Sequence, residues 1–305
     1  MDDSVLVTGG AGFIGSNLTI HLVNAGYDVT ILDKLTYAGD RSNVDPVADQ
    51  ITFYEGDIRN RELVSSIYED VNCVVNLAAE SHVDRSIDSG DPFVESNVHG
   101  AFVLMDELRS NKIETFVQMS TDEVYGSIEE GTFDESDNLD PSSPYSASKG
   151  AADLFANAFR ETYDLPITIA RCTNLFGPRQ HSEKLIPKMI QRAQDNEPLP
   201  VYGDGTNQRE WLFVEDACEA LHVLLEDGLS EVYNIGGGTE KQNIEVVSTI
   251  VDELDVSNDL IEFVEDRPGH DYRYALDYTK LRSELGWEPT VSFQEGLRRT
   301  IEWYS

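Results

Sequence analysis

The chain of 305 residues carries 57 acidic and 22 basic residues, a formal net charge of −35, and 40% of its residues are hydrophobic. This composition is typical of a soluble globular protein rather than a disordered one, and the length favours two subdomains over one small core. The charge argues against nucleic acid and anionic membranes as partners. We interpret it as an adaptation to very high salt; an ordinary acidic cytosolic protein is the alternative.

Targeting and metal-binding signals are weak. No apolar run approaches the roughly 18 residues that a membrane helix needs, and the N-terminus shows no signal peptide, so we expect a cytoplasmic protein. Cys73, Cys172 and Cys218 are far apart and lack paired metal-ligand spacing. We therefore expect buried thiols in a reducing compartment, and no metal site.

The first predicted strand, residues 4–8, leads into a glycine-rich turn and then a helix to about residue 25. Glycines at 9, 12 and 15 permit a tight turn, close approach of a pyrophosphate and close packing of helix on strand. The phosphates would lie at the helix N-terminus, which favours anions. The next strand, 28–32, ends in Asp33, whose carboxylate can bind a ribose 2′-hydroxyl and repel a 2′-phosphate. This unit predicts binding of NAD in preference to NADP.

The pattern of a strand followed by a helix continues to residue 171. Strands are predicted at 51–54, 72–77, 116–120 and 166–171, and helices at about 92–109 and 143–163. This alternation predicts an α/β fold with a Rossmann-like, doubly wound parallel sheet. His82 follows one of these strands without a second histidine or cysteine at ligand spacing, so a substrate contact or a loop histidine is favoured over a metal ligand.

After residue 171 the pattern loosens into a smaller, interleaved lobe. The predicted elements are helices at 183–196, 214–225 and 244–254, strands at 199–202, 209–213, 231–235 and 261–264, and two terminal helices. We expect the strand at 231–235 to return to the main sheet. The expected division is an NAD-binding domain over 1–171, with a later contribution from about 214–235, and a mainly substrate-binding lobe over 172–305.

Two short motifs carry groups suited to acid–base chemistry. Thr121, Asp122 and Glu123 follow the strand at 116–120, at the sheet edge where ligands bind in open α/β sheets. Tyr145 and Lys149 lie four residues apart at the start of a helix, so they project from one face. An ammonium group beside a phenol lowers the tyrosine pKa from about 10 toward working pH, which would make Tyr145 a base. The alternative for the two acids is a solvated acidic loop.

Gly9-x-x-Gly12-x-x-Gly15 together with Tyr145-x-x-x-Lys149 resembles the extended short-chain dehydrogenase/reductases that act on nucleotide sugars, the NAD-dependent epimerase/dehydratase family. Within it, segments at 33–39, 78–86, 120–126, 183–187 and 266–271 are most similar to the dTDP-glucose 4,6-dehydratase family, and the resemblance covers essentially the whole chain. Removal of water needs both an acid and a base, which adjacent Asp122 and Glu123 would supply. UDP-sugar 4-epimerases and UDP-glucuronate decarboxylases, which usually lack the adjacent acids, and a non-catalytic NAD-binding protein are the alternatives.

The resemblance implies a reaction in three steps on a nucleotide-diphosphate hexose. Tyr145 would take the C4 hydroxyl proton while hydride passes to NAD, with Thr121 on the same oxygen and Lys149 on the nicotinamide ribose. Glu123 would then remove the C5 proton while Asp122 protonates the departing C6 hydroxyl. Return of the hydride to C6 would give a 4-keto-6-deoxy sugar, so the cofactor is not consumed.

The resemblance also implies which residues bind each ligand. The expected NAD contacts are Gly9, Gly12, Phe13, Ile14, Gly15, Asp33, Lys34, Leu35, Thr36, Asp57, Ile58, Leu77, Ala78, Ala79, Ser81, Ser96, Tyr145 and Lys149. The expected substrate contacts are His82, Thr121, Asn174, Lys184, Leu185, Tyr202, Arg209, Asn243, Arg267 and His270, and the arginines suit a diphosphate.

The chain differs from the family at one place, and the family also suggests how the chain assembles. After Asn174 the family often has a second asparagine and a tyrosine, whereas this chain has Leu175 and Phe176, which leaves the identity of the nucleotide open. The family suggests a homodimer formed through the helices near 92–109 and 143–163.

Overall fold

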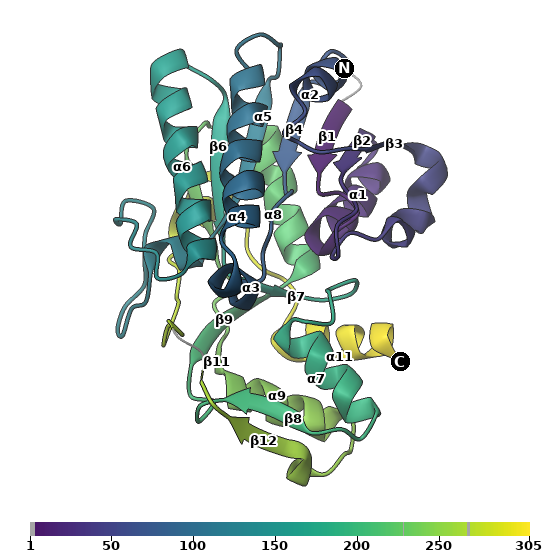
Figure 1. Cartoon of the computed structure of the whole chain (residues 1–305), viewed down its shortest axis with the longest axis vertical. Helices are drawn as coiled ribbons and strands as arrows, with labels where there is room; N and C mark the ends of the chain where they lie inside the picture. The colour runs from purple at the N-terminus through teal and green to yellow at the C-terminus, as the bar shows by residue number, and fades with distance from the viewer. Residues whose placement is uncertain (1–3, 228, 267–268) are drawn as a thin grey trace.

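The computed structural model describes residues 4–227, 229–266 and 269–305. Within these residues the main sheet has seven parallel strands in the order β10-β6-β5-β4-β1-β2-β3 (Figure 1). Their bounds are β1 (Ser4–Thr8), β2 (Asp28–Asp33), β3 (Ile51–Glu55), β4 (Cys73–Asn76), β5 (Thr115–Thr121), β6 (Ile167–Cys172) and β10 (Val232–Ile235). The predicted parallel sheet is confirmed, and the last strand returns to it beside β6, as expected.

Helices cover both faces of this sheet, which explains why its strands are apolar on both sides. One face packs against α1 (Phe13–Ala25), α8 (Val214–Asp227) and α10 (Thr279–Leu285) in a core that includes Leu18, Leu221 and Leu281. The other face packs against α2 (Arg61–Tyr68), α5 (Ala101–Glu107) and α6 (Pro144–Tyr163) around residues such as Phe116 and Phe159. The sheet is thus enclosed by helices on both faces.

The smaller lobe lies below the carboxyl ends of the strands in Figure 1. It contains a sheet of β7 (Asn174–Phe176), β9 (Gln208–Phe213) and β11 (Glu240–Gln242), and a parallel pair of β8 (Leu199–Tyr202) and β12 (Ile261–Val264). Around them are α7 (Leu185–Gln194), α9 (Asn243–Glu253) and α11 (Phe293–Tyr304), which share a core with Trp211 and Phe213. This lobe therefore has its own hydrophobic core beside the strand ends.

The structure differs from the predicted elements in several places. The helix expected at 92–109 consists of α4 (Asp91–Phe93), a π-helical segment η2 (Val94–Gly100) and α5. At the end of the π-helical segment, Gly100 leaves room for the Ile58 side chain, whose Cδ1 would lie 2.4 Å from an added Cβ. The helix expected from residue 183 begins only at Leu185. Elements that were not predicted are α2, α3 (Val83–Asp88), β7, β11 and the 3₁₀ segments η1 (Arg41–Gln50), η3 (Asp122–Tyr125) and η4 (Asn258–Leu260).

Two expectations from composition can be compared with the structure. The three cysteines are free and buried, as predicted. Among the described residues, no helix combines the length and the apolar character needed to cross a membrane.

Candidate active site

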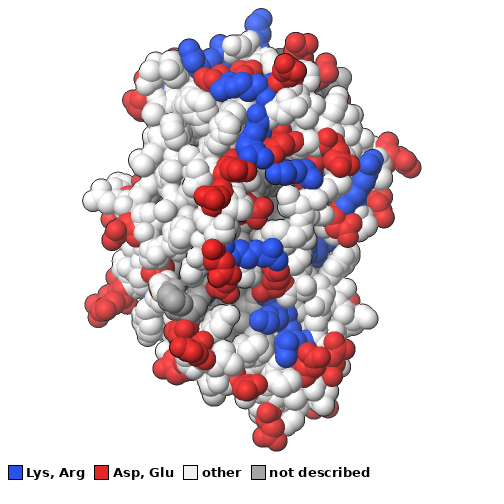
Figure 2. All heavy atoms as spheres, in the orientation of Figure 1, with Lys and Arg blue, Asp and Glu red and all other residues white. Residues whose placement is uncertain are grey.

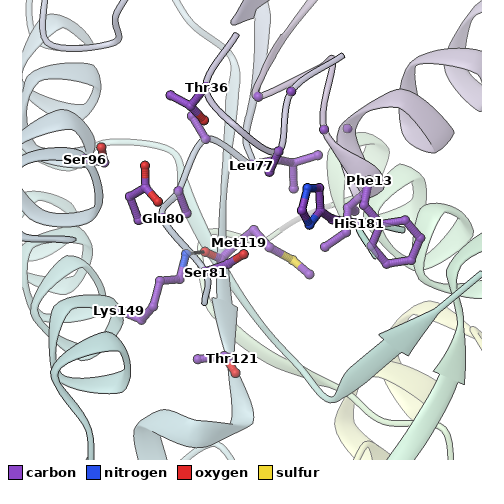
Figure 3. A pocket seen from close by; sticks show the side chains of 18 of the residues that line it. Phe13, Thr36, Leu77, Glu80, Ser81, Ser96, Met119, Thr121, Lys149 and His181 are labelled. Atoms are coloured by element: carbon purple, nitrogen blue, oxygen red, sulfur yellow. Dashed lines mark hydrogen bonds between the residues drawn. The ribbon is translucent and has the colours of Figure 1, made fainter. Parts of the chain in front are cut away.

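A cavity of about 300 Å³ lies where the strand order reverses, at the carboxyl ends of β1, β2, β4 and β5 (Figure 3). This is the position at which open α/β sheets bind ligands. The predicted cofactor residues that line it are Gly9, Gly12, Phe13, Ile14, Gly15, Asp33, Lys34, Thr36, Asp57, Ile58, Leu77, Ala78, Ala79, Ser81, Ser96, Tyr145 and Lys149. Leu35 does not line it.

The glycine-rich turn could not be built from other residues. Gly9 has a φ of 68°, and an added Cβ there would lie 2.8 Å from the backbone nitrogen of Ala78. A Cβ on Gly15 would lie 2.1 Å from the carbonyl oxygen of Gly9. Gly12 caps α1 without a side-chain hydrogen bond, so the N–H groups of the first helical turn are available to an anion. This cradle fits the pyrophosphate of a dinucleotide.

Asp33 connects the end of β2 to the glycine-rich turn. Its carboxylate accepts hydrogen bonds from the backbone N–H groups of Ala11, at 2.9 Å, and Leu35, at 2.8 Å. Leu35 therefore acts through its backbone, at a φ of 53°, rather than by lining the cavity. Burial raises the pKa of Asp33. Farther along the cavity, Lys34 forms an ion pair with Asp57 at 3.0 Å.

The end of β5 presents three polar side chains with different surroundings. The Thr121 hydroxyl accepts a hydrogen bond from the N–H of Glu123, at 3.3 Å, and donates one to Oδ1 of Asp122, at 3.1 Å. Asp122 is buried, and this burial together with the charges of Glu123 and Glu210 raises its pKa to about 8. The raised pKa favours the protonated form of Asp122, which is the form that a general acid needs.

Tyr145 and Lys149 lie in the first turns of α6, which begins with a capping box between Ser143 and Ser146. The Lys149 ammonium donates to the carbonyl oxygen of Met119 at 2.6 Å, and Figure 3 shows the two residues side by side. Burial lowers the pKa of Lys149 to about 8.

The predicted lowering of the Tyr145 pKa is wrong for this arrangement. Burial and the nearby Glu123 raise the pKa of the phenol, and a hydrogen bond with Thr121 offsets only part of that effect. The Lys149 ammonium is directed to a backbone carbonyl. The four-residue spacing of Tyr145 and Lys149 therefore did not determine the pKa of the phenol.

The predicted substrate residues divide into two groups. Thr121, Asn174 and Lys184 line the cavity, and the Lys184 ammonium donates to the carbonyl oxygen of Ser81 at 2.7 Å. His82 and Leu185 do not line it: His82 caps α3, and Leu185 is the first residue of α7. Burial and the nearby Lys184 lower the pKa of His82. Among the described residues, no group of three or more histidine, cysteine and acidic side chains is placed to hold a metal.

The described members of the second group lie in the smaller lobe and do not line the cavity. The ring centroids of Tyr202 and His270 are 6.2 Å apart. The Arg209 guanidinium donates to the carbonyl oxygen of Asp271 at 2.9 Å. The backbone N–H of Asn243 donates a hydrogen bond to the carbonyl oxygen of Asn207. The Tyr202 hydroxyl reaches Oδ2 of Asp84 in α3, at 3.4 Å. Arg267 lies outside the described residues.

The cavity also includes polar residues that were not predicted, among them Glu80, Thr173, Gln180 and His181. Thr173 follows β6 directly, so the strand-end argument that identified Thr121 would also have identified it. Gln180 and His181 lie in an irregular segment without a motif, and no signal in the sequence marks them.

Comparison with known proteins gives a consistent result over the whole chain. A family model described as GDP-mannose 4,6 dehydratase matches residues 6–300. The chain is 55% identical to a low-salt glycan biosynthesis protein of Haloferax volcanii, with 98% of each chain covered. It is similar to a dTDP-glucose 4,6-dehydratase from Streptomyces venezuelae solved with NAD, with a TM-score of 0.97 and 45% identity, covering 99% and 96% of the chains. A UDP-glucose 4-epimerase from Thermus thermophilus, solved with NAD, gives 0.92 at 31% identity over 99% and 98%.

Proposed function

Because the chain belongs to the GDP-mannose 4,6 dehydratase family, we propose that it is an NAD-dependent hydro-lyase that converts dTDP-glucose to dTDP-4-keto-6-deoxyglucose. The observation that carries this proposal is the buried Asp122, whose pKa burial raises, beside the half-buried Glu123, at the cavity that Tyr145 and Lys149 also line. An epimerase or a decarboxylase on the same scaffold is less well supported, because it would need no such acid–base pair and the epimerase compared is less similar in sequence.

The residues of the cavity fit NAD. The glycine-rich turn and the start of α1 hold the pyrophosphate, Asp33 binds the adenosine ribose, and Lys149 binds the nicotinamide ribose. Bound there, the cofactor supplies reversible hydride transfer and is regenerated in each turnover.

Tyr145 and Thr121 act on the C4 oxygen of the sugar. Tyr145 takes the hydroxyl proton, and Thr121 holds the oxygen by a hydrogen bond. Because burial and Glu123 raise the pKa of Tyr145, the phenol needs a compensating positive charge to act as a base. Lys149 supplies this charge only if its ammonium turns from the Met119 carbonyl toward the phenol when the ligands bind.

Asp122 and Glu123 act on C5 and C6. A ketone at C4 makes the C5 proton acidic, and Glu123 removes it. Asp122 gives its proton to the C6 hydroxyl, which leaves as water when the C6–O bond breaks. A carboxyl that is protonated at neutral pH suits this step, because its proton is available before the bond breaks.

The smaller lobe, mainly residues 172–305, binds the nucleotide diphosphate in this proposal, whereas residues 1–171 with 214–235 bind NAD. Asn174 and Lys184, which line the cavity, flank the sugar, and His82 and Leu185 contact the substrate from outside the cavity lining. Tyr202, Arg209, Asn243, Arg267 and His270 contact the nucleotide and its phosphates.

The proposed assembly is a homodimer formed through α6 and the helical segment from α4 to α5. The side chains of Val94, Leu154, Phe155 and Tyr163 are 57%, 62%, 37% and 45% exposed on these helices. Association of the two helical faces would remove this apolar surface from water.

We further infer that the enzyme works in the cytoplasm at high salt. Acidic side chains are spread over the face seen in Figure 2 rather than gathered at one site. At a net charge of −35 their mutual repulsion opposes the compact state, and salt screens that repulsion.

Incubation of the purified enzyme with dTDP-, UDP- and GDP-glucose tests the proposal. Dehydration lowers the sugar-nucleotide mass by one water without net release of NADH, and we expect dTDP-glucose to react best. A product of unchanged mass would indicate an epimerase. Stoichiometric NADH release would indicate a simple dehydrogenase, and an absence of any product would favour a non-catalytic NAD-binding protein.

A further inference from the structure

Thr173 connects Asp122 to the smaller lobe through two short oxygen–oxygen contacts. Its Oγ1 atom lies 3.2 Å from Oδ2 of Asp122 and 2.9 Å from the carbonyl oxygen of Glu210. All three residues are buried, with exposed fractions of 4%, 2% and 2%. Thr173 follows β6, Asp122 follows β5, and Glu210 lies in β9, so the contacts join three strands that are distant in sequence.

A hydroxyl has one hydrogen and cannot donate fully to both neighbours. The Glu210 carbonyl can only accept, and it is the nearer of the two, so the hydroxyl hydrogen is directed to it. The Thr173 oxygen then presents a lone pair to Oδ2 of Asp122. If Asp122 were ionised, a lone pair on its Oδ2 would face the lone pair on Thr173 Oγ1, which is unfavourable. If Asp122 is protonated, its Oδ2–H group donates to Thr173.

We propose that Thr173 is a positioning residue that keeps the proton of Asp122 on Oδ2 in the resting enzyme, through the series Asp122 Oδ2–H, Thr173 O–H, Glu210 C=O. The proposal rests on the function proposed above, in which Asp122 is the general acid. In the elimination, the C6 oxygen replaces Thr173 as acceptor: the Asp122 O–H bond breaks, a new O–H bond forms on the C6 oxygen, and water leaves.

The other contacts of these residues support the same proton placement. The Thr121 hydroxyl contacts Oδ1 of Asp122 at 3.1 Å, whereas Oδ2 is the carboxyl oxygen that faces Thr173. The Glu210 carbonyl is held in place because the Glu210 carboxylate accepts hydrogen bonds from the N–H groups of Gly238 and Leu276.

Several other charged or titratable groups face Asp122, and each is included in the test. The acids Glu123, on the same 3₁₀ segment, and Glu210, in β9, oppose ionisation of Asp122, and Arg209, also in β9, favours it. Tyr145 of α6 and Cys172 of β6 also interact electrostatically with Asp122. Because all of them are retained in a Thr173 variant, a change in the titration of Asp122 reports on the hydroxyl.

The test compares Thr173→Val, which removes the hydroxyl, with Thr173→Ser, which keeps it. The carbonyl stretch of the protonated Asp122 carboxyl is isolated as the infrared difference between each protein and its Asp122→Asn counterpart, across pH. We expect the Thr173→Val band to disappear about one pH unit lower than in the wild type, because the neutral carboxyl has lost its acceptor. The Thr173→Ser band should titrate as in the wild type.

Single-turnover kinetics provide the second readout. In Thr173→Val, the pH at which the dehydration rate falls off on the alkaline side should be lower than in the wild type. In Thr173→Ser it should not change. The rate of NADH formation from C4 oxidation should change little in either variant. An unmoved titration, or one moved to higher pH, would show that the hydroxyl is not needed or that it donates to the carboxylate, and would overturn the proposal. Should Thr173→Val lose bound NAD or its fold, Thr173→Ala replaces it with the same expected direction. If the wild type removes no water, the proposed function fails, but the infrared titration still decides the role of Thr173.

Discussion

Asp122 and Glu123 are consecutive residues with different surroundings: the Asp122 side chain is 2% exposed, whereas Glu123 is only half-buried at the cavity. A turn of 3₁₀ helix at the end of β5 directs Asp122 toward Thr173, and Thr121 caps this turn. Two carboxyls whose environments differ in this way can act as acid and base at the same pH. Their roles should therefore separate on mutation.

We expect Glu123→Gln to oxidise C4 and then stop. The variant keeps Tyr145, Lys149 and Thr121 but lacks the base for the C5 proton. A rapidly quenched single turnover should contain NADH and a 4-keto-hexose that still bears its C6 hydroxyl, with little exchange of the C5 proton in deuterated solvent. The loss in dehydration rate should be about 10²–10⁴-fold.

The matched variants Asp122→Asn and Tyr145→Phe locate the other two steps. Asp122→Asn should lose a similar factor of about 10²–10⁴ in dehydration while retaining slow C5 exchange. Tyr145→Phe should form no NADH at all. If Glu123→Gln dehydrated its substrate at nearly the wild-type rate, Glu123 would not be the base and the dehydratase proposal would lose its main support.

We expect NAD to bind far more tightly than NADP. The Asp33 carboxylate is held at the glycine-rich turn by two backbone N–H groups, at 2.8 and 2.9 Å, so it cannot move away from a 2′-phosphate without breaking them. Asp33→Ala should narrow the difference in affinity, as measured by calorimetry on protein freed of cofactor. Asp45→Ala, which removes an exposed acid that does not line the cavity, is the control. Equal affinity of the wild type for the two cofactors would refute this reading.

We expect the thermal midpoint to rise steeply between dilute buffer and molar KCl. Molar salt reduces the Debye length to about 3 Å, which screens repulsion among the acidic side chains. NaCl should act like KCl at equal ionic strength if screening is the cause, and activity should increase in parallel. A midpoint that does not depend on salt would reject the proposed adaptation.

We expect Leu154→Glu to weaken the proposed dimer. Leu154 is 62% exposed on α6, and a charge there would be buried without a partner in the interface. Phe263→Glu is the control, since Phe263 is 57% exposed but lies on β12 in the smaller lobe. Sedimentation in molar KCl should show monomers for the first variant only. Monomeric wild-type protein would contradict the assembly.

We expect Gly15→Ala to prevent NAD binding and to lower stability. The added Cβ would lie 2.1 Å from the Gly9 carbonyl oxygen, so the turn would have to move. Gly150→Ala in α6 is the control, because its nearest neighbour would be 3.8 Å away and alanine favours a helix. Retained NAD and an unchanged thermal midpoint in Gly15→Ala would show that the cradle tolerates a side chain.

Features that depend only on residues close together in the sequence were predictable from it. The glycine-rich turn, the apolar strands and the capped start of α6 are determined within a few residues, so the parallel sheet and the position of the cavity at its strand ends followed from local patterns. The strand at 232–235 was placed correctly in the sheet because it is a short apolar strand that follows a helix. Helix starts were less accurate, as at Leu185, because Lys184 has an extended backbone and donates to Ser81, which is distant in sequence.

Only the tertiary structure decided the electrostatics of the site. The spacing of Tyr145 and Lys149 indicated a lowered tyrosine pKa, but burial and Glu123 raise it, and Lys149 donates to Met119 on β5. The contact of Asp122 with Thr173 and Glu210 joins β5, β6 and β9, which no local pattern relates. The sequence by itself determined which chemical groups are present and which strand ends carry them. Protonation depends on burial and on charges brought together by long-range packing, so only the folded chain showed that the pKa of Asp122 is raised.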